Sequence, residues 1–147
     1  MSTPPRARHA SHEFVNERNE CHTAQFATRW LRPALAIVTV HGELDAANAK
    51  DFADYALRHA PDLDGLVVDM SGVQFFGTAG FSALHTLNVR CAGDRIEWAL
   101  TPSPAVNRLL RICDPDSALP ICDTVDVALS TVQGQSPRLL QLVAKSR

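Results

Sequence analysis

Residues 66–84 read LVVDMSGVQFFGTAGFSAL. The segment Gly65–Asp69 is a short apolar run that ends in an aspartate, which is typical of a buried β-strand. Serine and glycine are common in turns, so the pair Ser71-Gly72 predicts that the chain turns there. A helix is expected from near Thr78 to Gly93, because apolar residues then recur at helical spacing. That apolar face consists of Phe81, Leu84, Leu87 and Cys91.

The same alternation of strand-like and helix-like segments continues on both sides of this stretch. Strands are expected at Ala24–Leu31, Leu35–Val40 and Arg95–Leu100. One helix is expected between Asp45 and Pro61, and another begins at Ser103-Pro104. Strands separated by single helices imply right-handed crossovers and parallel pairing. The sequence therefore predicts an α/β fold, a mixed β-sheet of about four to five strands packed with about four helices.

The chain divides into a body and two tails. Residues 1–22 are polar and lack strand or helix periodicity, so they are expected to form a flexible N-terminal tail. Residues 23–133 form the folded domain. Residues 134–147 are expected to be a C-terminal tail, either frayed or folded as a short amphipathic helix. No apolar stretch approaches the length of a membrane span and no secretory signal is visible, so we expect a cytoplasmic protein without membrane insertion.

Charge and cysteine usage narrow the possible partners. The 147 residues carry a formal net charge of −2, and the body has eight basic against thirteen acidic residues. This balance disfavours direct binding to nucleic acid.

The four cysteines are Cys21, Cys91, Cys113 and Cys122, and none of them forms a CxxC motif. Reduced thiols are expected, with redox regulation as a weaker alternative, and no metal site is expected.

Enzyme signatures are missing from the sequence. It contains no phosphate-binding GxxxxGK[ST] loop, no GxGxxG, no GxSxG and no HExxH. The aspartates stand where helices start and chains turn, which are capping and turn duties. We therefore expect no catalytic residues, no cofactor and no enzymatic activity.

Two motifs resemble the STAS family, the domain of bacterial anti-sigma-factor antagonists. The first is VHGELDAANAKDF at 40–52, and the second is the stretch 66–84. The family has a strand ending in G-x-L-D, a buried strand with D-[LM]-S-x-[VL], and a loop D-[ST]-[SAT]-G-[LF] that enters a helix. The resemblance covers residues 23–133 and implies a single STAS-type domain.

The resemblance implies that Thr78 is a phosphoacceptor, because it occupies the hydroxyl position of the family loop. The sequence departs from the family at Gly77, where aspartate is usual. The residues themselves support the choice, because a loop entering a helix offers unpaired N–H groups and a positive dipole end that tolerate a phosphate. The alternative is that Thr78 is a plain helix N-cap.

The resemblance also implies a binding surface and a partner. Asp45 is either a helix cap or a contact to the partner. The expected partner-binding residues are Asp45, Phe76, Gly77, Thr78, Ala79, Gly80 and Phe81.

The implied function is that of an anti-sigma-factor antagonist. Such a protein binds an anti-sigma factor of the serine/threonine-kinase type, releases a sigma factor for transcription, and is switched off by phosphorylation of Thr78. The alternative is a constitutive STAS adaptor subunit of a transport or stress-signalling assembly.

Overall fold

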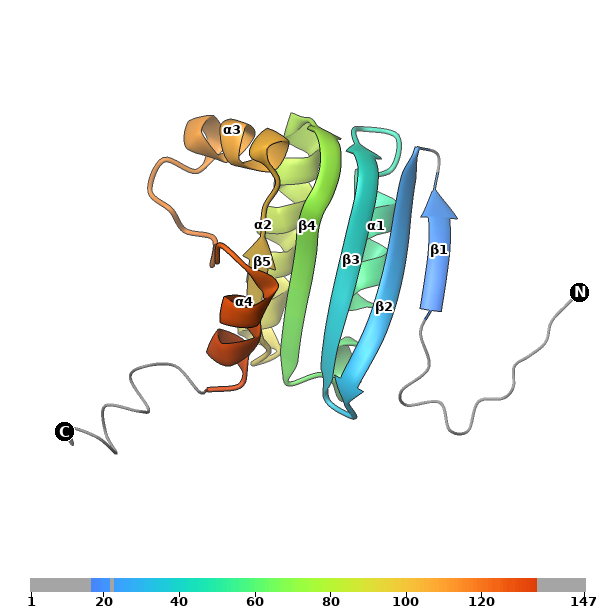
Figure 1. Ribbon diagram of the computed structural model, residues 1–147, viewed down its shortest axis with the longest axis vertical. Coiled ribbons are helices and arrows are strands. Elements are labelled where there is room, and N and C mark those ends of the chain that lie inside the picture. The colour runs from blue at the N-terminus through green and yellow to red at the C-terminus, as the bar shows by residue number, and fades with distance from the viewer. Residues whose placement is uncertain (1–16, 22, 135–147) are drawn as a thin grey trace, which may run out of the picture.

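The computed structural model describes residues 17–21 and 23–134 and is built on a five-stranded sheet in the order β1-β2-β3-β4-β5 (Figure 1). Pairing is antiparallel from β1 to β3 and parallel from β3 to β5. The strands are β1 Glu17–Cys21, β2 Ala24–Arg32, β3 Leu35–Leu44, β4 Gly65–Phe76 and β5 Glu97–Thr101. The α-helices are α1 Ala49–Leu57, α2 Thr78–Gly93, α3 Pro104–Cys113 and α4 Val125–Val132, with a 3₁₀ turn η2 at Ala60–Asp62. The predicted mixed α/β architecture is confirmed.

Strand β1 corrects the expected N-terminal boundary of the domain. It lies inside residues 1–22 and pairs with β2 from Glu17↔Thr28 to Cys21↔Ala24. Strand pairing of this kind is made by main-chain groups, which any sequence supplies, and the polar sequence ERNEC has no apolar periodicity from which a strand could be predicted. The expectations for residues 1–16, and for a C-terminal tail or helix over 135–147, lie outside the described residues.

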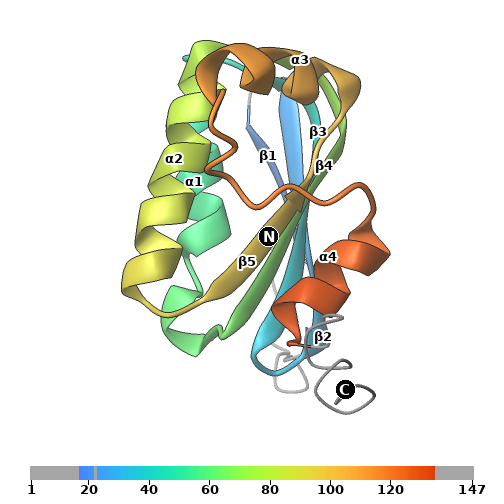
Figure 2. The same cartoon turned by 90° about the vertical axis from the view of Figure 1, so that its left-hand side faces the viewer.

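Helices cover the two faces of the sheet unequally (Figure 2). The helices α1 and α2 lie on one face, because both connect parallel strands that follow each other in one direction across the sheet. The main core fills this side and includes Phe26, Phe52, Leu84 and Leu100. On the opposite face, α4 covers a smaller cluster of Leu35, Ile37, Val67, Ala99, Ala128 and Val132.

Strand β4 continues past the point where the sequence predicted a turn. Its pairing with β3 shifts between Thr39 and His41 and again between Gly42 and Glu43, and each shift adds one residue to β4. Met70 and Ser71 therefore form the first bulge, Gly72 pairs with His41, and the predicted turn is wrong. Because each extra residue reverses the inward and outward alternation, the core residues of β4 change spacing. They are Leu66, Val68, Met70, Val73 and Phe76.

Burial makes the thiol of Cys91 on α2 less reactive than those of Cys113 and Cys122. The side chain is fully buried, and this burial raises the pKa of the Cys91 thiol to about 12. Cys113 and Cys122 are partly exposed free cysteines. At neutral pH we expect iodoacetamide to label Cys113 and Cys122 in the folded protein and to spare Cys91 until urea is added, because the thiolate is the reactive form. Peptide mass mapping measures this, and equal labelling of Cys91 without urea would contradict the buried position.

Candidate partner-binding site at the start of helix α2

The ends of β3 and β4 lie side by side and form the base of the site. Leu44 pairs with Phe76 as the last residues of the two strands. The N–H of Gly77 then donates to the carbonyl oxygen of Leu44 over 3.0 Å. Because Asp45 and Gly77 directly follow these residues, they leave the sheet at the same edge. The structure therefore brings together the two motifs that the sequence analysis singled out.

Thr78 is the first residue of α2 and is exposed to solvent. The N-cap is Gly77, at φ −95° and ψ 178°, and it has no side chain with which to cap the helix. The interpretation of Thr78 as a plain N-cap is therefore wrong. Gly77 has no need of the left-handed conformation, and a β-carbon built on it would make only ordinary contacts, the nearest 3.5 Å from Phe75 Cε2.

No negative charge within the first turn of α2 compensates the positive end of the helix dipole. The backbone N–H groups of Thr78 and Ala79 find no acceptor within the described part of the chain. The first turn of α2 also contains no acidic side chain. Unpaired N–H groups and the helix dipole both favour a negative charge at this position. A phosphate on the Thr78 hydroxyl would therefore meet a locally favourable field.

Phe76 and Gly80 form a tight contact beneath the loop. A β-carbon at Gly80 would lie 2.4 Å from Phe76 Cε1, so only glycine leaves room for the ring. Phe76 is 6% exposed. Phe76 therefore offers a partner little surface, and its partner-binding role stays a prediction. The neighbouring Phe75 is 51% exposed and lies outside the expected set of partner-binding residues.

Asp45 caps a turn before α1, and the cap position of α1 itself is Asn48. The Asp45 carboxylate accepts from the N–H of Ala47 at 2.9 Å. The N–H of Asp45 donates to Asn48 Oδ1 at 3.0 Å, and Asn48 Nδ2 donates to the carbonyl of Glu43 at 2.9 Å. The predicted helix cap at Asp45 is thus displaced by one turn, and the fully buried Asn48 holds the bend.

The remaining residues of the predicted surface lie around Thr78. Ala79 and Phe81 are partly buried and pack against the main core. Asp45 is partly exposed at the neighbouring strand end. Asp45, Thr78, Ala79 and Phe81 therefore remain candidates for contact, with Gly77 presenting its backbone.

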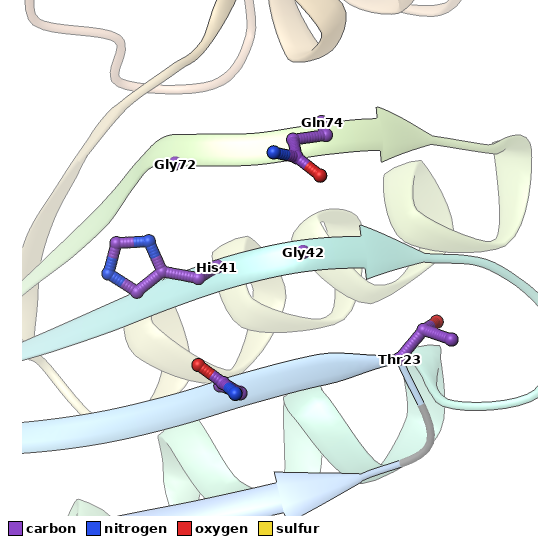
Figure 3. A pocket seen from close by; sticks show the side chains of 6 residues that line it. Thr23, His41, Gly42, Gly72 and Gln74 are labelled. Atoms are coloured by element: carbon purple, nitrogen blue, oxygen red, sulfur yellow. The ribbon is translucent and has the colours of Figure 1, made fainter.

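A separate pocket of about 250 Å³ lies on the opposite side of the sheet from α1 and α2 (Figure 3). It forms where Gly42 and Gly72 leave out side chains, and the His41 ring stands over Gly72. Gln25 and Gln74 complete its polar wall.

Within residues 17–21 and 23–134, no three His, Cys, Asp or Glu side chains lie close enough together to hold a metal ion. None of the helices in that part is long and apolar enough to cross a membrane.

Fold and site together define a small α/β domain whose distinctive surface is a loop and a helix start at the ends of parallel strands. The chain belongs to the STAS domain family, whose model matches residues 31–128.

Relatives and solved structures agree with this family. Osmosensory protein A of Mycobacterium tuberculosis is 33% identical over 118 residues, covering 78% of this chain and 75% of the relative. The anti-sigma-F factor antagonist RsfA of the same species is 30% identical over 98 residues, covering 64% and 77%. A crystal structure of an anti-sigma factor antagonist from Mycobacterium paratuberculosis superimposes with a TM-score of 0.66 at 24% identity, covering 75% and 94%. The last comparison confirms the STAS-type fold.

The contact between Gly80 and Phe76 predicts a difference between two glycines of one helix. Gly80→Ala should lower the free energy of unfolding by about 1–3 kcal/mol, because the new methyl group overlaps the Phe76 ring. Gly93→Ala is the matched control, since no atom lies within 4 Å of its β-carbon position. It should be neutral or stabilise α2 by about 0.5–1 kcal/mol. Urea denaturation measures both, and equal effects would contradict the packing.

The hydrogen bonds of Asn48 predict a second stability effect. Asn48→Leu should lower the free energy of unfolding by about 1–3 kcal/mol, because the N–H of Asp45 and the carbonyl of Glu43 lose their partner. The exposed Asn107 on α3 provides a control, and Asn107→Leu should change stability by less than about 0.5 kcal/mol. Thermal unfolding of both variants measures this. A harmless Asn48→Leu would show that the bend does not depend on these bonds.

Proposed function

We propose that this protein is a cytoplasmic anti-sigma-factor antagonist without enzymatic activity. It binds an anti-sigma factor of the serine/threonine-kinase type and thereby frees a sigma factor for transcription. Phosphorylation of Thr78 reverses the binding. The names of RsfA and of the Mycobacterium paratuberculosis protein support the general role. The observation that carries the proposal is the exposed Thr78 hydroxyl at the uncompensated start of α2.

The position of Thr78 explains how one phosphate can act as a switch. The phosphate adds a charge of about −1.5 to −2 at neutral pH. In the free protein, the N–H groups of Thr78 and Ala79 and the dipole of α2 stabilise this charge. In the complex, the same charge would have to leave water beneath the partner. Because burial of an unpaired charge is costly, phosphorylation favours the free protein.

Gly77 distinguishes this chain from the usual family loop, which has aspartate there. A side chain fits at this position, because the nearest atoms to a β-carbon lie at 3.5 Å or more. The glycine removes a carboxylate that would otherwise lie beside the attacking hydroxyl and the incoming phosphate. We propose that the kinase therefore acts on Thr78 without help from this residue. A constitutive adaptor is the competing function that Gly77 favours.

Replacing Thr78 tests the switch. The unmutated full-length chain should capture a kinase-type anti-sigma factor from its own cells, identified by mass spectrometry. Thr78→Glu should weaken the complex by about tenfold or more, because the carboxylate introduces a charge at the contact. Thr78→Ala should still bind, and it should no longer accept phosphate from ATP.

The matched control is Thr86→Glu, which adds the same charge to another exposed threonine of α2. Its binding should stay close to that of the unmutated chain. If Thr78→Glu binds as well as the unmutated chain does, the switch is wrong. Recovery of transporter or scaffold subunits with unmodified Thr78 would instead assign the adaptor function.

A further inference from the structure

A groove of about 210 Å³ lies between the end of β4 and helix α3. We name it the α3 groove, and its main walls are Phe75, Arg108, Leu109 and Ile112. Its floor includes the ring of Phe76, which belongs to the main core. The sequence motifs include only the β4 side of this surface, because its walls come from segments more than a full helix apart in the chain.

The α3 groove is apolar and open to solvent. Phe75 is 51% exposed and Ile112 is 74% exposed, which is the largest exposure of any large hydrophobic side chain in the described residues. Helix α3 buries only Val106 and Leu110. A strongly amphipathic helix that leaves apolar side chains in water beside an exposed aromatic ring is typical of a protein-binding surface.

The groove carries positive charge on an acidic body. Arg108 lines it, and Arg111 is exposed one turn further along α3. Neither arginine forms an ion pair with the part of the chain that the structure describes. The nearby Asp114 carboxylate is already used, since it accepts from the N–H groups of Ala118 and Leu119. An occupant with carboxylates beside apolar residues would therefore complement the groove.

The α3 groove is continuous with the Thr78 loop. The Phe75 ring, which forms one wall, has its Cε2 atom 3.5 Å from the β-carbon position of Gly77, and Gly77 is the N-cap of α2. A partner that covers Thr78 therefore reaches the groove within one residue of the loop. The Phe75 ring belongs to both surfaces.

We propose that the α3 groove receives an amphipathic, acidic segment of the same anti-sigma factor that covers Thr78. This inference rests on the proposed function and adds the second contact of the partner. The apolar side chains of the segment pack against Phe75, Leu109 and Ile112, and at least one carboxylate pairs with Arg108. A guanidinium and a carboxylate can form two parallel hydrogen bonds, which would also fix the direction of the segment.

The test compares groove variants with controls in binding to the captured anti-sigma factor. Phe75→Ser combined with Ile112→Ser should weaken binding by about tenfold or more, because exposed aromatic and aliphatic anchors dominate such contacts. Val127→Ser on α4 is the control, since Val127 is also 51% exposed and lies outside the groove. Arg108→Glu should weaken binding to a similar extent, whereas Arg29→Glu on β2 should leave it unchanged.

A second arm tests the chemistry of the groove without the partner. Two helical peptides share leucines at the i, i+3, i+4 and i+7 positions, and carry either glutamate or lysine between them. The glutamate peptide should shift the amide NMR signals of Phe75, Arg108 and Ile112 in the full-length chain. The lysine peptide should do so only after Arg108→Glu.

The outcomes separate the two proposals. If the groove variants bind the anti-sigma factor normally while Thr78→Glu does not, the groove inference is wrong and the proposed function stands. If no anti-sigma factor binds the unmutated chain, the proposed function fails. The peptide arm then decides whether the groove takes an acidic segment, and absent shifts overturn that as well. Self-association that disappears with Phe75→Ser would assign the groove to a second copy and overturn the inference.

Discussion

The parallel pairing between β3 and β4 is the contact on which the site depends. It extends from Leu35↔Gly65 to Leu44↔Phe76, although β4 has more residues over this length than β3. The additional residues are absorbed as bulges at Met70-Ser71 and at Gln74, so the two strands still end together. This common end places Phe76 over the core, turns Phe75 outward, and puts Gly77 within hydrogen-bonding distance of Leu44. If one of the two bulges were absent, the alternation would be reversed once and the two aromatic residues would exchange faces.

The surface around Thr78 combines a rigid base with an exposed polar tip. Phe76 packs directly on the backbone of Gly80, so the first turn of α2 is attached to the core rather than to a mobile loop. Thr78 is nevertheless exposed to solvent. A rigid base matters for a binding surface because little conformational entropy is lost when the partner docks.

The sequence predicts the regular parts of this structure well, because they carry strong local signals. The β-branched run at Leu35–Val40, the apolar face of α2 and the cap at Ser103 all appear in the structure, the last with a hydrogen bond from the N–H of Val106. The errors fall where tertiary pairing overrides a local signal. Ser71-Gly72 has the composition of a turn yet continues a strand, and β1 pairs with β2 although its sequence has no apolar periodicity. The sequence predicts Asp45 as the cap of α1, whereas the cap is Asn48, whose hydrogen bonds depend on a bend that composition does not reveal.

The two faces of the sheet are covered by cores of unequal size, so the helices on them should differ in their resistance to local unfolding. Helix α4 is attached to its face of the sheet through a cluster with only Ala128 and Val132 as its own buried residues. The strands beneath it are also held by the much larger core on the opposite face. Local unfolding of α4 should therefore cost less than the opening of β3, β4 and α2, which the larger core holds together. Proteolysis near α4 should therefore leave the Thr78 loop in place, because α2 packs on the face of the sheet that carries the larger core.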